Sequence, residues 1–528
     1  METSPASMPV SVRKPARLWP ARWLLVIAVI GSVAIRFLPQ LAFQERNLWT
    51  AALVILTTLL LFIWWVFFSR VRWWKRLAGL ALVGLLVGAL IGTFRIRAVS
   101  GDLLPILEPR WAAHASSQKV QSQTPPSAAA TVDLPSVSKV PNRSDFAQYL
   151  GPTRDTVVRG PALDPDWVAH PPQVLWRQPV GAAWSGFVIV GDRALTQEQN
   201  GTNELVTCRQ LATGAIQWVH TDPAQYDTVI AGAGPRQTPV VVGGRVFTLG
   251  ATGLLNCLEL ASGQRLWGTN ILTLAHAAVP DFGLAGTPLV SAGRVIVQAG
   301  GKAGQSLLAF DASTGALIWS TGDQPADYSS PTALTLAGVP QVLLFTSQRI
   351  AAHDPATGRL LWDRPFGTKF PLVANPLSIG PDQVLISAGY GVGAEALEVK
   401  RSAEGAWTVN SLWVSKRMKA KFHHPVQRAG FVYGLDDGMF ACLNLKDGTS
   451  AWKGDRYGHG QGLLVGDHYL LMAESGELVL LQPTPEAPHE LAKFRVFDRK
   501  TWNPIALSGD LLLVRDDEEA ALIRLAVK

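Results

Sequence analysis

A short repeat constrains the fold of this chain more than any other feature: a turn glycine is followed, four residues later, by a tryptophan. The regular copies are Gly214/Trp218, Gly263/Trp267, Gly315/Trp319, Gly358/Trp362 and Gly448/Trp452. Two looser copies end at Trp176 and Trp413, and the same step beyond Trp452 reaches Phe494. Successive copies are about 40 to 50 residues apart, which is the length of a four-stranded propeller blade. The eight positions predict eight blades.

The residues around each copy support a strand, a turn and a second strand. Alternating residues such as Leu308 and Phe310 lead into the turn, as expected for a half-buried strand. A polar residue stands four positions before each regular glycine: Gln210, Glu259, Asp311, Asp354 and Asn444. Asp or Asn can accept backbone hydrogen bonds there, and glycine can take a positive φ. We expect the tryptophan on the second strand to fill the wedge between adjacent blades.

The cysteines follow the same repeat. Cys208, Cys257 and Cys442 each stand six residues before a turn glycine, where two other copies have Ala309 and Ala352. This slot therefore suits a small, buried core residue. Equivalent sites on neighbouring blades would be separated by about the 10 Å between packed sheets, which is too far for a disulfide. We predict three free, buried thiols.

The first hundred residues have a different character. Apolar stretches cover residues 23–42, 48–68 and 77–94, and each approaches the ~20 residues that a helix needs to cross a bilayer. Residues 111–145 are rich in Ser, Ala, Pro and Gln and cannot bury a core. The predicted organisation is a basic cytoplasmic leader at 1–22, a three-helix transmembrane anchor at 23–95, an extracytoplasmic flexible linker at 96–145 and the propeller at 146–528.

Basic residues next to the apolar stretches predict the orientation of the anchor. The leader has four Lys or Arg, and the loop between the second and third stretches adds Arg70, Arg72, Lys75 and Arg76. In the first loop, Arg46 is balanced by Glu45. We therefore expect a multi-pass protein of the bacterial inner membrane with its propeller in the periplasm, although Arg95 and Arg97 beyond the third stretch argue mildly against this. Arg36, near the far end of the first stretch, can snorkel to the interface and is interpreted as structural.

The overall net charge of +7 belongs to the anchor region. Residues 1–110 have 13 Lys or Arg and 4 Asp or Glu, whereas the remaining residues have 34 and 36. The large domain is therefore almost neutral, and we predict no nucleic-acid partner. The expected partners are membrane lipid, through the three helices, and a protein of the cell envelope.

The two ends of the propeller region predict how the ring closes. Inner strands are expected to begin near residues 183, 236, 285, 329, 374, 423, 460 and 502. The last blade then has only three strands of its own before Lys528, whereas the strand around Trp176 has no blade before it. We predict that this early strand completes the last blade, because such closure removes open sheet edges.

The Gly/Trp repeat is similar to that of the pyrroloquinoline-quinone (PQQ)-type β-propeller family. The segment DFAQYLGPTRDTVV and the S-x-P starts of inner strands resemble its non-catalytic bacterial branch, which includes the outer-membrane protein assembly lipoprotein. The resemblance covers about residues 146–528 and leaves out the anchor. The chain departs from that lipoprotein in having no lipobox cysteine. The resemblance implies an all-β, eight-bladed propeller with four-stranded antiparallel blades, here preceded by three transmembrane helices.

Catalytic members of that family suggest the alternative, a membrane-bound PQQ-dependent dehydrogenase of alcohols or sugars. They hold the quinone against a Trp, often with a vicinal disulfide, and bind Ca²⁺ through Glu, Asn and Asp, with an Asp as general base. This chain has no adjacent cysteines, no acidic residue at the inner-strand starts and no C-x-x-C-H haem motif. We therefore predict no catalytic residue, metal or cofactor, and reserve PQQ and calcium for the alternative.

The candidate binding residues lie near the predicted inner-strand starts. Trp184, Arg236, Tyr328, Phe422 and Trp502 take similar positions there, and His423 and His459 begin consecutive inner strands. Aromatic residues and Arg are enriched in protein interfaces, which favours a binding mouth on the channel. Ordinary packing of the rings and a polar channel lining for the histidines are the alternatives. The sequence favours a protein-binding or scaffolding module.

Overall fold

The computed structural model describes residues 18–38, 41–112 and 144–528. The chain divides into two compact units, Met1–Ala113 and His114–Lys528, which are described one after the other. Residues 1–17 of the predicted leader and residues 113–143 of the predicted linker lie outside the described residues.

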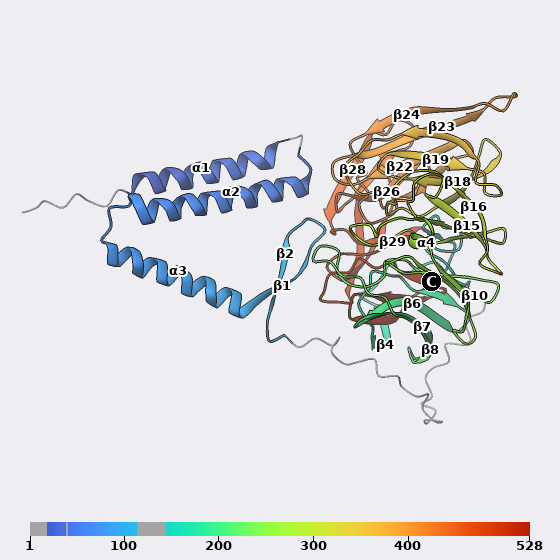
Figure 1. Ribbon diagram of the computed structural model, residues 1–528, viewed down its shortest axis with the longest axis horizontal. Helices are drawn as coiled ribbons and strands as arrows, with labels where there is room; N and C mark the ends of the chain where they lie inside the picture. The colour runs from blue at the N-terminus through green and yellow to red at the C-terminus, as the bar shows by residue number, and fades with distance from the viewer. Residues whose placement is uncertain (1–17, 39–40, 113–143) are drawn as a thin grey trace, which may run out of the picture. The chain divides into compact units, whose positions relative to one another are not determined.

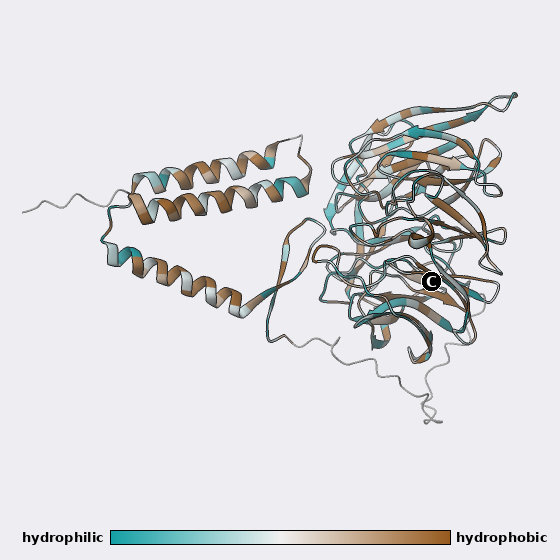
Figure 2. Ribbon diagram, viewed as in Figure 1, coloured by the Kyte–Doolittle hydropathy of each residue, from teal (hydrophilic) through white to brown (hydrophobic). Residues whose placement is uncertain are grey.

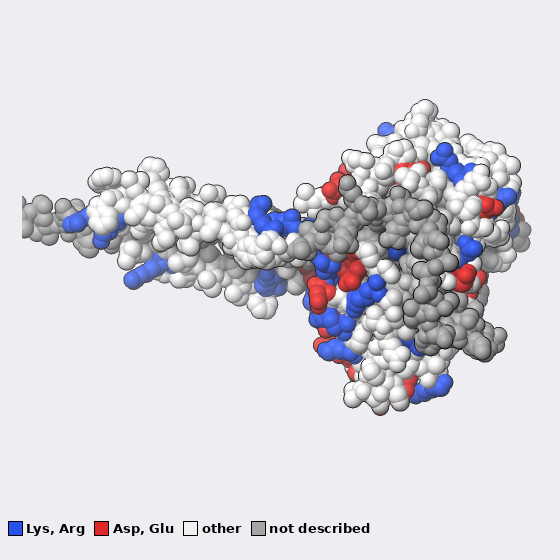
Figure 3. Space-filling view, turned by 90° about the horizontal axis from the view of Figure 1, so that it is seen from below, with Lys and Arg blue, Asp and Glu red and all other residues white. Residues whose placement is uncertain are grey.

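The first unit contains three long apolar helices. They are α1 (Trp19–Phe37), α2 (Phe43–Ile63), which continues through the π-helical turn η1 (Trp64–Phe68), and α3 (Trp73–Thr93). Each is long and apolar enough to cross a membrane, and apolar residues run along all three in Figure 2. In Figure 3, Lys and Arg gather at both ends of this unit, with uncharged surface between them. The predicted helices are confirmed, and they fit a membrane anchor.

The helices begin about four residues before the predicted apolar stretches. Hydropathy marks the part of a helix that suits hydrocarbon, whereas the helix itself extends into flanking aromatic and polar residues. At the start of α2, the Glu45 side chain accepts a hydrogen bond from the Ala42 backbone N–H at 2.8 Å and caps the helix. Between the first two helices, Arg36 Nη1 donates to Asn47 Oδ1 at 2.7 Å, in agreement with the structural interpretation of Arg36.

A β-hairpin follows α3 without a break, which the sequence analysis did not predict. Its strands are β1 (Phe94–Val99) and β2 (Pro105–Pro109), with Ile96 opposite Leu107. The prediction placed Phe94 and Arg95 in the anchor and residues 96–109 in the flexible linker, and it weighed Arg95 and Arg97 only as charges beyond the third apolar stretch. Their alternation with Phe94 and Ile96 is in fact the two-residue period of a strand.

The second unit is the predicted eight-bladed propeller (Figure 1). From inner to outer strand, the first four blades are β5 (Val188–Val190), β6 (Arg193–Asn200), β7 (Asn203–Gln210), β8 (Ile216–Asp222); β9 (Val240–Val242), β10 (Arg245–Leu249), β11 (Leu254–Glu259), β12 (Arg265–Asn270); β13 (Leu289–Ser291), β14 (Arg294–Gln298), β15 (Leu307–Asp311), β16 (Leu317–Thr321); and β17 (Thr332–Leu336), β18 (Val339–Phe345), β19 (Arg349–His353), β20 (Leu360–Pro365). A short helix, α4 (Ile271–Leu274), follows β12.

The remaining blades have the same order. They are β21 (Leu377–Gly380), β22 (Gln383–Ala388), β23 (Gly393–Arg401), β24 (Trp407–Ser415); β25 (Val426–Arg428), β26 (Phe431–Asp436), β27 (Met439–Asn444), β28 (Ser450–Arg456); β29 (Gln461–Val465), β30 (His468–Met472), β31 (Glu477–Gln482), β32 (His489–Arg495); and β33 (Ala506–Ser508), β34 (Leu511–Arg515), β35 (Glu519–Arg524), β4 (Gln173–Pro179). Within each blade, adjacent strands are antiparallel, and the core lies between neighbouring sheets.

The ring closes as predicted. β4 pairs with β35 as the outer strand of the last blade, with Trp176 opposite Leu522. One strand is additional: β3 (Val157–Val158) pairs in parallel with the inner strand β29. The early part of the chain therefore contributes to both the outer and the inner side of the propeller.

The repeated tryptophans join neighbouring blades. The indole of one blade lies against the turn glycine of the next: a Cβ added to Gly263 would be 2.3 Å from Trp218 Cε3, and one added to Gly448 would be 2.4 Å from Trp413 Cε3. The indole N–H also crosses the seam, as Trp218 Nε1 donates to the Leu260 carbonyl at 3.0 Å. The predicted position of the rings between blades is confirmed. The same contact pairs Gly214 with Trp176, Gly315 with Trp267 and Gly358 with Trp319.

Among the described residues, two of the repeated tryptophans have no turn glycine of the next blade against their indole: Trp362 and Trp452. The indole N–H of Trp452 still crosses the seam, to the Thr484 carbonyl at 2.9 Å. Trp362 Nε1 donates to Gln341 Oε1, in its own blade, at 2.7 Å. The next blade carries its turn glycine, Gly405, at the end of a long hairpin whose last pair is Arg401 and Trp407. The turn therefore lies beyond the level of the indoles, which explains why the repeat around Trp413 looked irregular in the sequence.

The cysteine slot lies directly opposite the tryptophan of its own blade. Cys257 pairs with Trp267 and Cys442 pairs with Trp452, while Ala309 takes the same place opposite Trp319. A small side chain is needed there because the indole covers it. All three cysteines are free and buried, as predicted, and burial raises the pKa of each thiol to about 11.

Candidate functional site

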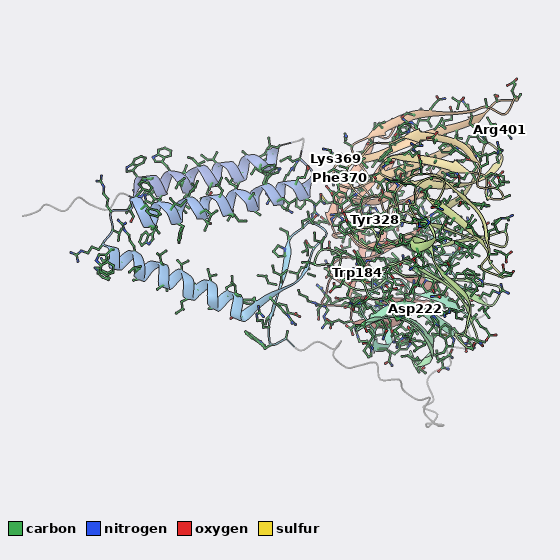
Figure 4. All side chains as sticks on the ribbon, in the orientation of Figure 1. Trp184, Asp222, Tyr328, Lys369, Phe370 and Arg401 are labelled. Atoms are coloured by element: carbon green, nitrogen blue, oxygen red, sulfur yellow. The ribbon has the colours of Figure 1, made fainter. Side chains whose placement is uncertain are left out.

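The predicted binding residues all lie in connections between the outer strand of one blade and the inner strand of the next. We call this face of the propeller the mouth. In Figure 4, Trp184, Tyr328 and Phe370 lie along this face, whereas Arg401, at the end of β23, lies at the opposite side of the propeller. The register explains the placement, because every inner strand starts at the same end of the ring.

Three of the predicted residues form a continuous row of half-buried rings, the aromatic arc: Phe422, Trp502 and Trp184. Ring centroids are 4.7 Å apart for Phe422 and Trp502 and 5.0 Å apart for Trp502 and Trp184. The Lys500 ammonium lies 3.8 Å from the Trp502 ring centroid and 4.6 Å from that of Trp184. The arc is therefore an apolar surface with a cation–π contact on its rings.

Hydrogen bonds fix the orientation of these rings. Trp502 Nε1 donates to Glu474 Oε1 at 3.0 Å, and Glu474 Oε2 accepts from the backbone N–H of His459 at 2.9 Å. Trp184 Nε1 donates to the carbonyl of Ala231. Because the rings are held before any partner arrives, binding to them would cost little side-chain entropy.

The remaining predicted residues extend the mouth away from the arc. Arg236 donates to the Gly232 carbonyl at 2.6 Å, and its guanidinium lies 4.5 Å from the Tyr226 ring centroid. Burial lowers the pKa of Arg236 to about 10, so the side chain is still positive at neutral pH. Tyr328 lies 5.5 Å from Phe282, centroid to centroid.

Sequence reasoning missed several members of this surface. Phe370 stacks on Tyr390 with centroids 5.1 Å apart, and the Lys421 ammonium lies 4.3 Å from the Tyr390 centroid. Lys421 directly precedes Phe422, and Lys500 stands two residues before Trp502, so a lysine next to an inner-strand aromatic was the available signal. Phe370 directly follows Lys369 and had the same signal, whereas Tyr390, between β22 and β23, had none.

The histidines have a different position from the one predicted. His423 and His459 are each 1% exposed, so they lie in the interior and not on the surface of the mouth. His423 Nε2 accepts from the Leu435 N–H at 2.7 Å. Such contacts position the connections that carry the aromatic arc. The described residues contain no group of three His, Cys, Asp or Glu that could hold a metal ion.

Burial and one neighbouring cation keep His424 uncharged. Its Nδ1 accepts from the Asn375 N–H at 2.9 Å, and its Nε2 shares a 2.6 Å hydrogen bond with the Tyr149 hydroxyl. Burial, with a smaller contribution from Arg154, lowers the pKa of His424 to about 3. Between pH 6.5 and 3 the unfolded chain therefore binds a proton that the folded chain does not, and stability is lost as the pH falls.

This difference predicts a pH-dependent effect of His424→Gln. Wild-type stability should lose about 1.4 kcal/mol per pH unit at this residue below pH 6.5, and the variant should not. The stability gap between the two proteins should therefore narrow from pH 7 to pH 4 in urea titrations. Glu204, whose pKa burial raises to about 7, changes stability in the opposite direction but is common to both proteins. A gap that stays constant would contradict the assignment.

The segment 144–158 lies along the inner strands of the ring. Phe146 pairs with Ile189 in the first blade, and β3 pairs with β29 in the seventh. Between them, Arg154 donates to the carbonyls of Pro288 and Pro331, at 3.3 and 3.4 Å, in the third and fourth blades. Residues 144–158 thus occupy space between the inner strands of the ring.

These residues do not fit a calcium-bound quinone. Calcium prefers carboxylate and carbonyl oxygens in a set of six to eight. Where inner strands begin, this chain presents Trp184, Arg236, Tyr328 and buried histidines. A nearby carboxylate, that of Asp327, already accepts the backbone N–H groups of Tyr328, Ser347 and Leu372, and the positively charged Arg154 uses nearby carbonyls. We therefore derive no catalytic step through PQQ.

The fold and the mouth together define an eight-bladed β-propeller with a preformed aromatic face, preceded by three apolar helices. The family model described as outer membrane protein assembly factor BamB matches residues 202–454, and these blades are similar to that family. No curated protein sequence matches the chain at a significant level.

The chain is similar to solved structures at low sequence identity. The quinohemoprotein alcohol dehydrogenase of Comamonas testosteroni is 12% identical, with 73% of this chain and 81% of that chain covered at a TM-score of 0.50. BamB of Moraxella catarrhalis is 16% identical, with 67% and 99% covered at a TM-score of 0.49. At these identities the similarity concerns the fold and not the chemistry.

Proposed function

We propose that this chain is a membrane-anchored propeller that binds a protein partner of the cell envelope through its mouth and acts as a scaffold. The observation that carries the proposal is the aromatic arc, whose rings are half-buried, in mutual contact and fixed by hydrogen bonds. Clustered Trp residues with nearby cations are typical of the centre of a protein interface. The assembly-factor description of the matching family agrees with a binding function.

A second feature extends this surface. The connection between β8 and β9 exposes Val229 and Ile230, at 81% and 51% of their surface. The following residue, Ala231, accepts the indole hydrogen bond of Trp184, which ties this apolar loop to the arc. An exposed apolar tip beside an ordered aromatic surface favours a folded protein or peptide as the ligand.

The proposed location is the periplasmic side of a bacterial inner membrane. The leader supplies four Lys or Arg, and the connection between η1 and α3 together with the first turn of α3 supplies four more, which is the pattern of cytoplasmic segments. Three spans then place the second unit on the other side of the membrane.

Photocrosslinking in cells tests the proposed interface. A benzoylphenylalanine at Val229 should give one defined protein adduct, whereas the same probe at Glu404, in the β23–β24 hairpin, should not. Trp502→Ala should lower the adduct yield at least about tenfold, as expected for a central aromatic residue. Trp407→Ala, in the same distant hairpin, is the matched control and should leave the yield unchanged.

Equal adducts from both probe positions would contradict the interface. The dehydrogenase alternative has a direct test in the same preparation. Dye reduction by the purified chain with PQQ, Ca²⁺ and an alcohol or a sugar would support catalysis instead of scaffolding.

A further inference from the structure

The hairpin of β1 and β2 has two unlike faces. Ile96 and Leu107 lie opposite each other on one face, where they are 60% and 53% exposed. The other face carries Arg95, whose guanidinium contacts Glu108 at 3.3 Å. An exposed apolar pair in a two-stranded hairpin is unfavourable in water, and such hairpins are only marginally stable alone. Something other than water should therefore cover this face.

The hairpin is attached to the helices at both ends. Arg110, just after β2, donates through its backbone N–H to the Thr93 carbonyl at 2.8 Å and through Nε to the Ile91 carbonyl at 2.7 Å. At the turn, Asn47 Nδ2 donates to the Asp102 carbonyl at 2.8 Å. The hairpin therefore runs from the end of α3 to the start of α2, as Figure 1 shows.

This attachment places the apolar face near the edge of the hydrocarbon layer. Ile96 is only three residues beyond Thr93, the last residue of α3, so its Cα is within about 11 Å of the helix end. Trp111, 73% exposed, follows the hairpin at the same end, and tryptophan is enriched where membranes meet water. Arginine side chains suit the phosphates of lipid headgroups.

We propose that the hairpin lies in the headgroup layer of the leaflet at the C-terminal end of α3, with Ile96 and Leu107 facing the acyl chains. The occupant of the apolar face is the phospholipid bilayer, because the face continues directly from a helix that is long and apolar enough to span it. Arg95 and Arg97 then bind lipid phosphates. This binding explains why basic residues follow α3 on the extracytoplasmic side, where few Lys or Arg are expected. The inference rests on membrane insertion of the three helices.

Spin-label accessibility in lipid nanodiscs tests the proposal with the full chain. Nitroxides at Ile96→Cys and Leu107→Cys should show a severalfold higher ratio of oxygen to nickel-chelate accessibility than one at Ile106→Cys on the opposite face. The three native cysteines are buried and should not be labelled. A label at Leu86→Cys, on an exposed position of α3, reports insertion of the anchor itself.

The outcomes distinguish a failure of the hairpin proposal from a failure of the membrane anchor itself. If Leu86 is in lipid while positions 96 and 107 are open to the nickel chelate, the hairpin is in water and this inference is wrong. If neither reagent reaches positions 96 and 107, protein covers the face, from this chain or a second copy, and the inference is also wrong. If Leu86 itself is open to the nickel chelate, the membrane anchor of the proposed function fails.

Discussion

Replacing Gly263 by alanine is expected to destabilise the propeller by about 2 to 5 kcal/mol. Gly263 has φ +73°, a left-handed conformation that costs an alanine about 1 to 2 kcal/mol. The added Cβ would also be 2.3 Å from Trp218 Cε3, so the indole must move. Overpacking of this kind costs about 1 to 3 kcal/mol more, and it weakens the hydrogen bond from Trp218 to Leu260. Urea denaturation, followed by near-ultraviolet circular dichroism, measures the loss.

Gly338→Ala is the matched control for this experiment. Gly338 has φ +69°, close to that of Gly263, but a Cβ there has no neighbour within 4 Å. The control should therefore lose only the 1 to 2 kcal/mol of the left-handed backbone. Equal losses in the two variants would show that contact between the turn and the indole does not hold the blades together.

The periodic part of this structure could be predicted from the sequence because it depends on short, repeated patterns. The turn glycine, the tryptophan and the cysteine recur at fixed offsets, so Cys257 could be predicted to be a small, buried core residue before any contact was known. Closure through the strand of Trp176 followed from counting strands in the last blade.

Other features depend on contacts between distant residues that no local pattern encodes. Arg154 bonds a carbonyl 134 residues away, and Tyr149 meets a histidine 275 residues away. At the mouth, the aromatic residues near the inner-strand starts were predicted. The contact of Lys500 with two indoles was not, because it requires the connection that leads into the eighth blade to meet the connection that leads into the first. The buried positions of His423 and His459 were missed for the same reason.

A buried cation, Arg515, lies at the closing seam. Arg515, at the end of β34 in the last blade, is fully buried and donates to Thr196 Oγ1 and the Gln197 carbonyl of the first blade, both at 3.1 Å. It also donates to the Gly181 carbonyl, just after β4, at 2.5 Å. Burial lowers its pKa to about 10, which leaves it charged at neutral pH. One side chain thus joins the last blade, the first blade and the strand that closes the ring.

Arg515→Met should therefore cost about 3 to 5 kcal/mol, because it leaves buried carbonyls unpaired and removes a cation near the buried Glu198 carboxylate. Arg524→Met is the matched control in the same blade. Among the described ion pairs, Arg524 forms only the one with Asp510, at 3.4 Å, and its side chain is partly exposed. This change should cost about 1 kcal/mol or less. Hydrogen exchange adds a readout specific to closure: amides of β4 should exchange faster in Arg515→Met, while those of β10 and β11 should not. Uniformly faster exchange throughout the propeller would mean that Arg515 supports general stability and does not hold the seam.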